Sequence, residues 1–258
     1  MAKYIGLVPA SKGWFGIVLG DDDTWEADLF PSVWSLWKYH SDAARVLVGA
    51  PVGLPADARR SCDVATKGKL GRHHHRAFYA PTRAAVYRGN LEAAKETNES
   101  AAGYSIRNQV WSLVPRIREV DEFLDENPGA RDRIGETHPE LCFYALNGRD
   151  AVAAPATTAE GVRRRTALLA DEHPDATAIH ETCRDRYTSP PYASFLRGEG
   201  TIVDALAAAV TARRDPDELS RLPERSDPPW DERGLPMQMV YPSDIAQTRL
   251  SRLGVRIT

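Results

Sequence analysis

Short apolar runs separated by turns fill the N-terminal part of the chain, and this pattern predicts strands. Tyr4–Val8 is almost entirely apolar, residues 9–13 have the composition of a turn, and residues 14–19 and 25–30 form two further strand-like runs. Connections this short join antiparallel neighbours. We therefore expect an antiparallel meander that begins with Tyr4–Val8.

A helical crossover should follow the meander. Ser32 is a suitable N-cap for a helix that runs to about Tyr39, and Arg45–Val48 is then a short apolar run. A strand reached through a helix lies parallel to the strand beside which it inserts. We expect Tyr4–Val8 in the middle of a mixed sheet, with residues 14–19 antiparallel to it and Arg45–Val48 parallel to it on the other side.

Helical periodicity dominates the second half of the chain. The clearest pattern begins near Ser105 and places apolar residues four, three, four, three and four positions apart up to Leu124, with Pro115 expected to kink the helix. Residues 215–234 are rich in proline and charge and predict a loop. Further helices are expected at residues 59–70, 157–170 and 201–213, and a last strand at residues 237–241.

A segment rich in ionisable side chains follows the long helix. Residues 133–136 predict a short strand, and Glu136 stands at its C-terminal end, before His138, Pro139 and Glu140. Open α/β sheets bind ligands outside the C-terminal edge of their strands, so these side chains are candidate site residues. The alternative is a polar loop in which His138 and Glu140 cap the next helix. The expected core of the sheet includes Leu7, Val46, Val48 and Ile134.

Length and composition bound the class of protein. A chain of 258 residues with 42% hydrophobic residues can form one large domain, which we place at residues 1–258, with a helical insertion at roughly 56–130. No apolar run reaches the roughly 18 residues of a membrane span, and the N-terminus lacks a secretory pattern. The three cysteines are widely spaced, which suggests reduced thiols and a cytoplasmic protein.

Three carboxylates are candidates for a metal site. Glu136 and Glu140 lie in the segment after the predicted strand, and Asp204 is the one acidic residue between Thr201 and Arg213. Carboxylates that converge from several elements hold Mg²⁺ or Mn²⁺, and two such ions support phosphoryl displacement. The alternative for Asp204 is an acid stabilised by the N-terminal dipole of its own helix.

Basic residues gather between Arg59 and Arg88, although the net charge of the whole chain is −3. Any nucleic-acid surface must therefore be local. Phe78, Tyr79 and Tyr87 are interleaved with the cations, which suits phosphates and unstacked bases, whereas the alternative is an ordinary exposed helical face. The isolated triplet His73–His75 is more typical of a surface than of a metal site. The candidate phosphate-binding residues are Arg59, Arg60, Arg72, Arg76 and Arg83.

Several of these segments together resemble domain of unknown function 429, a family of predicted ribonuclease H-like nucleases. The resemblance covers nearly the whole chain and is carried most specifically by two elements: Gly135-Glu-Thr-His-Pro-Glu-Leu-Cys-Phe143, and the Pro51-Val-Gly-Leu-Pro55 loop followed by Arg60-Ser-Cys-Asp63. It implies a ribonuclease H-like α/β fold, in which a mixed sheet is covered by helices on both faces. It also implies a divalent-metal site at the ends of the central strands and the activity of a hydrolase.

Two positions depart from the family pattern. The aspartate that the family usually carries on the first strand is replaced by Val8, and the one after the fourth strand by Gly49. Neither side chain can ligate a metal ion. The expected Mg²⁺ or Mn²⁺ site is therefore degenerate, and the ion is absent if the remaining acids do not suffice.

The sequence thus leaves alternative functions open. The first is a nuclease relative that acts on or binds nucleic acid, with Glu136 and Asp204 as metal ligands in one cleft, assisted by His138 and Glu140. The second is a non-catalytic binding or regulatory protein for nucleic acid or another phosphate-bearing ligand, which keeps the fold without metal chemistry. A phosphotransferase or phosphohydrolase is a third possibility, but the chain lacks a phosphate-binding glycine loop.

Overall fold

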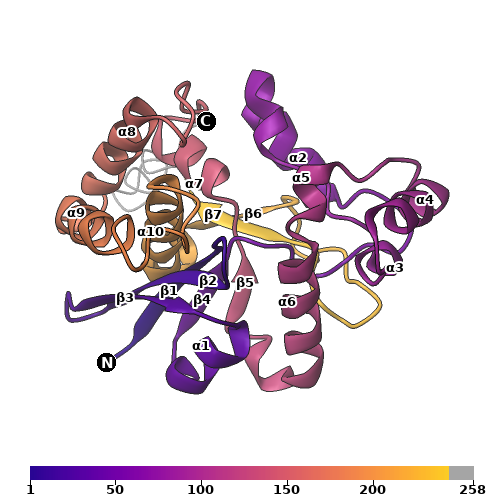
Figure 1. The fold of residues 1–258 in the computed structure, drawn as a ribbon, viewed down its shortest axis with the longest axis horizontal. Coiled ribbons are helices and arrows are strands. Elements are labelled where there is room, and N and C mark those ends of the chain that lie inside the picture. Colours follow the sequence, from indigo (N-terminus) through magenta and orange to yellow (C-terminus); the bar gives the residue numbers. More distant parts are fainter. Residues whose placement is uncertain (244–258) are drawn as a thin grey trace.

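A mixed sheet of seven strands forms the centre of the protein (Figure 1). The structure is a computed structural model and describes residues 1–243. The strand order is β3-β2-β1-β4-β5-β7-β6. The strands are β1 (Lys3–Pro9), β2 (Trp14–Gly20), β3 (Trp25–Phe30), β4 (Arg45–Val48), β5 (Ile134–Glu136), β6 (Leu219–Leu222) and β7 (Met239–Pro242).

The pairing of β1 confirms the arrangement expected from the sequence. β1 is antiparallel to β2, with Val8 opposite Phe15, and parallel to β4, with Leu7 opposite Val48. β5 continues the parallel part of the sheet beyond β4, and β6 forms an antiparallel edge. The four residues expected in the core, Leu7, Val46, Val48 and Ile134, are all buried.

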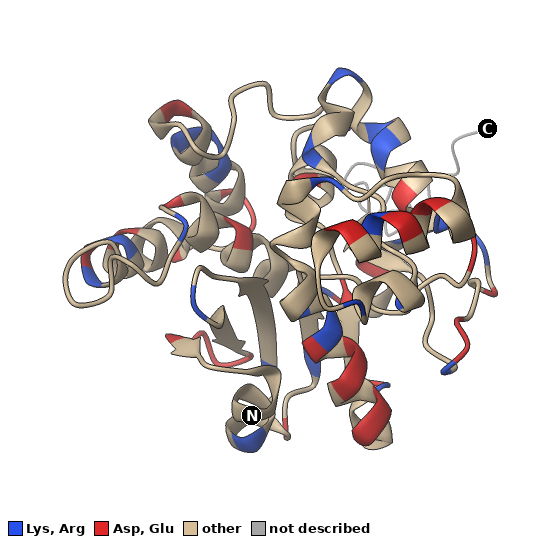
Figure 2. Ribbon diagram, turned by 45° about the vertical axis from the view of Figure 1, so that its right-hand side comes forward, with Lys and Arg blue, Asp and Glu red and all other residues tan. Residues whose placement is uncertain are grey.

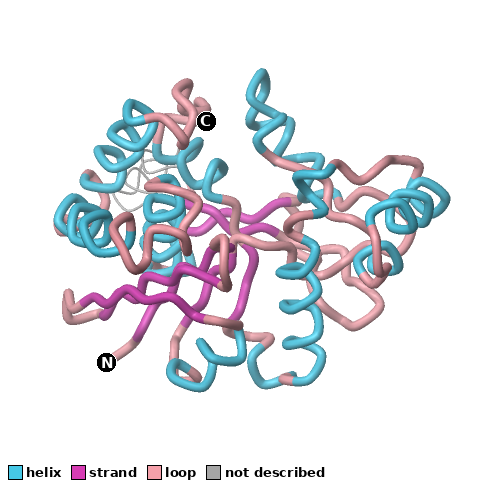
Figure 3. Tube along the Cα trace, viewed as in Figure 1, coloured by secondary structure: helices cyan, strands magenta, loops and turns pink. Residues whose placement is uncertain are grey.

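Helices cover both faces of the sheet (Figure 3). One apolar core lies between the sheet and α7–α10, and a second lies between the sheet and α1 and α6. The helices on the first face are α7 (Pro139–Leu146), α8 (Ala159–Ala170), α9 (Ala176–Tyr187) and α10 (Gly200–Arg213). Those on the second face are α1 (Val33–His40) and α6 (Val114–Glu126).

The chain between β4 and α6 forms a lobe of short helices beside the sheet (Figure 1). These are α2 (Ser61–Leu70), the 3-10 helix Gly71–Arg76, α3 (Arg83–Val86), α4 (Leu91–Ala102) and α5 (Asn108–Trp111). Two further 3-10 turns are Pro128–Ala130 and Pro216–Glu218. None of the helices in residues 1–243 is long and apolar enough to cross a membrane.

Helix α10 packs closely against β1. Nearly every residue of α10 is buried, and the helix contacts the strand at Gly6, where a Cβ atom would lie 2.1 Å from the Ala205 carbonyl oxygen. Only glycine permits this approach. The contact brings the N-terminal end of α10 to the C-terminal end of β1. Residues of the first turns of α10 therefore face this edge of the sheet.

Two expectations about individual elements were wrong, and two helices were not expected at all. The helix expected from Ser105 is divided into α5 and α6, because Pro115 stands in the first turn of α6, where its missing N–H costs nothing, and kinks no helix. Residues 215–234 were expected to be a loop but contain β6, which pairs with β7. The helices α4 and α9 were not foreseen.

Candidate functional site at the carboxyl edge of the sheet

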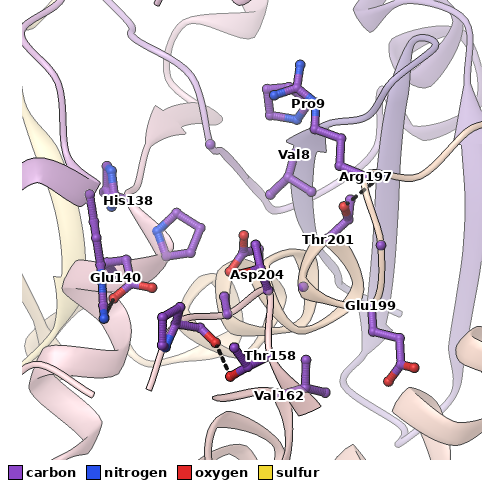
Figure 4. A pocket seen from close by; sticks show the side chains of 18 of the residues that line it. Val8, Pro9, His138, Glu140, Thr158, Val162, Arg197, Glu199, Thr201 and Asp204 are labelled. Carbon is purple, nitrogen blue, oxygen red and sulfur yellow. Dashed lines mark hydrogen bonds and ion pairs between the residues drawn. The ribbon is translucent and has the colours of Figure 1, made fainter. Parts of the chain in front are cut away.

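A pocket of about 610 Å³ lies at the C-terminal end of the parallel strands (Figure 4). Val8 and Gly49, from the ends of β1 and β4, line its floor. The two positions are adjacent, since a Cβ atom at Gly49 would lie 3.1 Å from Val8 Cγ1. His138 and Glu140 from the start of α7 and Asp204 from α10 line it as well. Val8 and Gly49, where the resemblance led us to expect strand acids, therefore line the same pocket as Glu140 and Asp204.

The other walls come from the N-terminal ends of α8 and α10, from the segment before α10, and from the 3-10 helix Gly71–Arg76. Thr158, the N-cap of α8, and Thr201, in the first turn of α10, line the pocket together with Arg197 and Glu199 (Figure 4). Arg76, from the 3-10 helix after α2, closes the side next to Glu140. The pocket thus combines elements from the sheet, from both flanking regions and from the helical lobe.

Asp204 is an unusual residue for its helix. Every other residue from Thr201 to Ala212 is buried, and Asp204 alone is partly exposed, into the pocket. It makes no hydrogen bond or ion pair with a residue in the part of the chain that the structure describes. Burial and, to a smaller extent, the nearby Glu140 carboxylate together raise the pKa of Asp204 to about 7, against the attraction of Arg165. A role in stabilising the helix dipole would require an acid in the first turn of α10. Because α10 begins at Gly200, Asp204 lies beyond that turn.

Glu140 is held by two guanidinium groups. Arg165 donates to Glu140 Oε1 at 2.6 Å, and Arg76 donates to Glu140 Oε2 at 3.1 Å. Arg165 is fully buried, and Arg76 also donates to the carbonyl oxygens of Val152 and Ala153. Both oxygens of the Glu140 carboxylate are therefore already occupied by charge-assisted hydrogen bonds.

His138 presents a neutral imidazole to the pocket. It is the N-cap residue of α7 but makes no capping hydrogen bond, so the capping role considered for it is not seen. Its Nδ1 atom is buried without a partner. Burial lowers the pKa of His138, with Glu140 acting in the opposite direction. An imidazole without a proton at one nitrogen can both accept from and donate to a ligand.

Glu136 lies outside this pocket, in a buried network below the loop after β4. Arg60 donates to Glu136 Oε2 at 2.7 Å and to Glu136 Oε1 at 2.8 Å, and the Val52 amide donates to Oε2 at 2.7 Å. Arg60 also pairs with Asp63. Burial raises the pKa of Glu136 to about 7, although the attraction of Arg60 lowers it. The structure therefore brings Asp204, His138 and Glu140 together and places Glu136 elsewhere.

The five candidate phosphate-binding arginines lie in different environments. Arg60 is buried with Glu136, and Arg76 is paired with Glu140. Arg83 donates to Asp121 at 3.0 Å and to Asp231 at 2.5 Å. Arg72 is exposed, and Arg59 is exposed with its guanidinium 4.6 Å from the ring centroid of Tyr79. Only these last two of the five therefore project from the surface.

Arg197 is a pocket residue that the sequence patterns did not single out. Arg197 is exposed, and its guanidinium makes no hydrogen bond or ion pair with any residue within 1–243; partial desolvation together with the nearby Arg116 lowers its pKa. A signal was available, because Arg197-Gly-Glu-Gly200 places a cation in a glycine-containing loop directly before a helix. Loops of this kind commonly bind anions.

The residues at the sheet edge do not fit a divalent-metal centre. Val8 and Gly49 offer no side-chain oxygen, Glu140 is held by two arginines and Glu136 by a third. Among residues 1–243, no group of three or more histidine, cysteine, aspartate or glutamate side chains is arranged to hold a metal ion. Asp204 and Glu199 are the pocket acids without an arginine or lysine partner among these residues, and no further histidine, cysteine or carboxylate completes a metal-binding group with them.

The sheet order and the edge pocket together define an open-sheet α/β protein with a polar pocket at the C-terminal ends of its parallel strands. The chain belongs to the family described as protein of unknown function (DUF429), which matches residues 8–227. The family membership suggested by the sequence motifs is thereby confirmed. No curated protein and no solved structure matches the chain significantly.

Proposed function

We propose that this protein binds a phosphate-bearing ligand, a nucleotide or the end of a nucleic-acid strand, in the edge pocket without a catalytic metal ion. The observation that carries this proposal is the distribution of charge in the pocket. Among the pocket acids, Glu140 is neutralised by Arg76 and Arg165, whereas Arg197 lines the pocket without a partner for its guanidinium in the described chain. The pocket therefore presents an unpaired cation, and the pKa of Asp204, about 7, leaves that acid only partly ionised near neutral pH.

Helix geometry supports an anionic ligand. The N-termini of α8 and α10, helices of 12 and 14 residues, both border the pocket. Unpaired amide groups and the helix dipole make such N-termini favourable places for phosphate. Thr158 and Thr201 add hydroxyl groups at the same places, although Thr158 already donates to the Pro155 carbonyl oxygen.

The remaining acids of the pocket are compatible with this ligand. Asp204 has a pKa of about 7, so near neutral pH a large share of the molecules carry a protonated Asp204 that can donate a hydrogen bond to a phosphate oxygen. Glu199 lies at the rim and is 3.7 Å from His180. A pocket of about 610 Å³ is also of the size that accommodates a mononucleotide.

Direct binding measurements test the proposal. Fluorescence anisotropy should be recorded with a single-stranded oligonucleotide carrying a 5′ phosphate, with the same strand lacking it, and with nucleoside monophosphates as competitors, each in EDTA and in Mg²⁺. We expect binding in EDTA, preference for the phosphorylated strand, and at least about a tenfold loss in Arg197→Ala, the magnitude of a lost charged hydrogen bond.

The matched control is Arg133→Ala, which removes an exposed arginine at the opposite end of β5. This variant should bind as the wild type does. Absence of binding at low salt, a requirement for Mg²⁺, or equal losses in the two variants would overturn the proposal. If the ligand is a nucleotide, the monophosphate should compete with the oligonucleotide. If the ligand is a strand end, only the oligonucleotide should bind.

A further inference from the structure

The Arg60 side chain is surrounded by oxygen atoms although it is buried. Its guanidinium donates to Asp63 Oδ1 at 2.6 Å, to Asp63 Oδ2 at 3.2 Å, and to both oxygens of Glu136. It also donates to the carbonyl oxygens of Val52 and Gly53, each at 3.2 Å. All its nitrogen atoms thus donate to protein oxygens, and water reaches about 1% of the side chain.

The two carboxylates in turn hold the surrounding backbone. Glu136 accepts from the Val52 amide at 2.7 Å, and Asp63 accepts from the Ala80 amide at 2.8 Å. One cation therefore connects the end of β5, the loop after β4, the beginning of α2 and the segment after the 3-10 helix. These are the segments that carry the floor and one wall of the edge pocket.

Two carboxylates and two peptide carbonyl groups make the kind of oxygen shell that proteins use for hard cations such as Ca²⁺ and Mn²⁺. In this protein a guanidinium from the chain occupies the shell. Its planar fork suits two carboxylates, and its charge does not depend on pH or on the supply of a metal.

We propose that Arg60 is a built-in cation of this sheet edge: it supplies from the chain the positive charge by which a bound ion would otherwise hold Glu136 and Asp63 together. The fold of this edge is then independent of metal. The inference does not depend on which ligand the neighbouring pocket binds.

Removal of the guanidinium should leave a buried anionic cavity that accepts an external cation. Arg60→Ala should lower the melting temperature by about 10 °C, because two buried carboxylates lose their partner. Methylguanidinium or Mn²⁺ should restore several degrees of that loss in a saturable way, since each binds only the folded variant. Neither compound, nor EDTA, should change the melting temperature of the wild type.

Two further variants separate this role from ordinary packing. Arg60→Ala with Glu136→Gln keeps the cavity but removes one carboxylate, and Mn²⁺ should no longer stabilise it. Arg60→Lys keeps a cation, so it should melt between Arg60→Ala and the wild type and show no response to Mn²⁺. If Arg60→Ala does not fold alone, its refolding yield should be measured with and without methylguanidinium. A higher yield with methylguanidinium would support the proposal.

Three results would overturn the proposal. One is an Arg60→Ala variant as stable as the wild type. Another is a loss of stability or of refolding that neither cation restores. The third is a wild type stabilised by Mn²⁺ in a way that Glu136→Gln abolishes, because Glu136 would then be bound to an external ion.

Discussion

Single residues decide what the edge pocket can bind, and Asp204 shows this most clearly. It is an acid on an otherwise apolar, buried helix, with Glu140 nearby and Arg165 engaged by Glu140. The charged groups around it are Glu140 on α7, Arg165 on α8, Arg76 on the 3-10 helix, and Arg197 and Glu199 before α10. A protonated Asp204 can donate to an anion, whereas an ionised Asp204 repels it.

The raised pKa of Asp204 predicts a loss of stability with rising pH. Unfolded aspartate titrates near 3.9, and folded Asp204 at about 7, so its contribution is fully present below about pH 4 and is lost as the pH rises to 7. The wild type should therefore lose stability between pH 5 and pH 8, whereas Asp204→Asn lacks this titration. The free energy of unfolding of Asp204→Asn minus that of the wild type should rise by about 2 kcal/mol from pH 5 to pH 8.

Urea unfolding of both proteins at the two pH values measures this effect. Glu136 titrates in the same direction, but it is common to both proteins and cancels from the comparison. A difference between wild type and Asp204→Asn that does not change between pH 5 and pH 8 would contradict the assigned environment of Asp204.

At the scale of elements, the parallel strands β1 and β4 end side by side at the pocket floor. Their terminal positions Val8 and Gly49 are in contact range and carry no acid. The change of both to aspartate would place two carboxylates beside Asp204. We expect the wild type to show little or no Mg²⁺-dependent cleavage of nucleic acid, and Val8→Asp with Gly49→Asp to gain measurable Mn²⁺ affinity, with a lower melting temperature because charge is placed near a buried sheet.

The corresponding double asparagine variant is the control, since it changes size but not charge. Calorimetric titration with Mn²⁺ should detect binding only to the aspartate variant, and a nuclease assay with Mg²⁺ and Mn²⁺ should accompany it. Robust cleavage by the wild type that Glu136→Ala abolishes would show that the buried glutamate still serves a metal reaction.

The contact of α10 with β1 leads to a second prediction at this scale. A methyl group at Gly6 would meet the backbone of Ala205 and Ala209, so Gly6→Ala must push the helix from the sheet. We expect a loss of about 3 kcal/mol or more in the free energy of unfolding. The control Gly68→Ala lies in α2 with open space around it and should be neutral or stabilising by about 0.5 to 1 kcal/mol. Equal effects of the two substitutions would refute this packing.

The main elements were predictable because their patterns are local. Alternation and short turns defined β1 to β3, and the apolar run of β4 could insert only in parallel after a helix. β6 was not predictable, because its pairing with β7 joins residues from a polar segment that has no strand pattern of its own. Helix α4 was not predicted from the sequence, because its exposed, acidic segment carries few apolar positions.

The candidate site was predictable only in part, for a similar reason. Asp204 and Glu140 could be chosen by residue type, and the structure places both at one pocket. Whether a carboxylate is free or paired depends on residues distant in sequence: Arg60 is 76 positions from Glu136, and Arg165 is 25 positions from Glu140. Local pattern contains no information about such pairs.

At the scale of the whole molecule, charge is unevenly distributed. Lys67 and Lys69 lie at the end of α2, close to Arg72, whereas α4 and the second half of α6 carry mainly acids (Figure 2). Opposite charges thus lie on different helices, with cations on α2 and acids on α4 and α6. A polyanion should approach from the α2 side, since the acidic helices repel it.

This distribution predicts which arginines determine the salt dependence of nucleic-acid binding. Arg59 and Arg72 are exposed, so the double alanine variant should reduce the slope of log affinity against log salt by about 0.7 for each phosphate that no longer has a cationic partner. Arg83→Ala should instead lower stability, because the buried Asp231 carboxylate loses its arginine partner and Asp121 keeps only Arg233 as a cationic partner within residues 1–243. An unchanged slope in the Arg59 and Arg72 variant would argue against a nucleic-acid track on this side.

The most direct test of a metal-free phosphate site is a crystal structure of the protein soaked with Mn²⁺ and a nucleoside monophosphate. We predict phosphate density beside the Arg197 guanidinium at the N-termini of α8 and α10, with Glu136 still paired to Arg60 and no anomalous manganese peak near either carboxylate cluster. A manganese ion bound by Asp204 together with Glu140 or Glu136, with the phosphate on the metal, would contradict it.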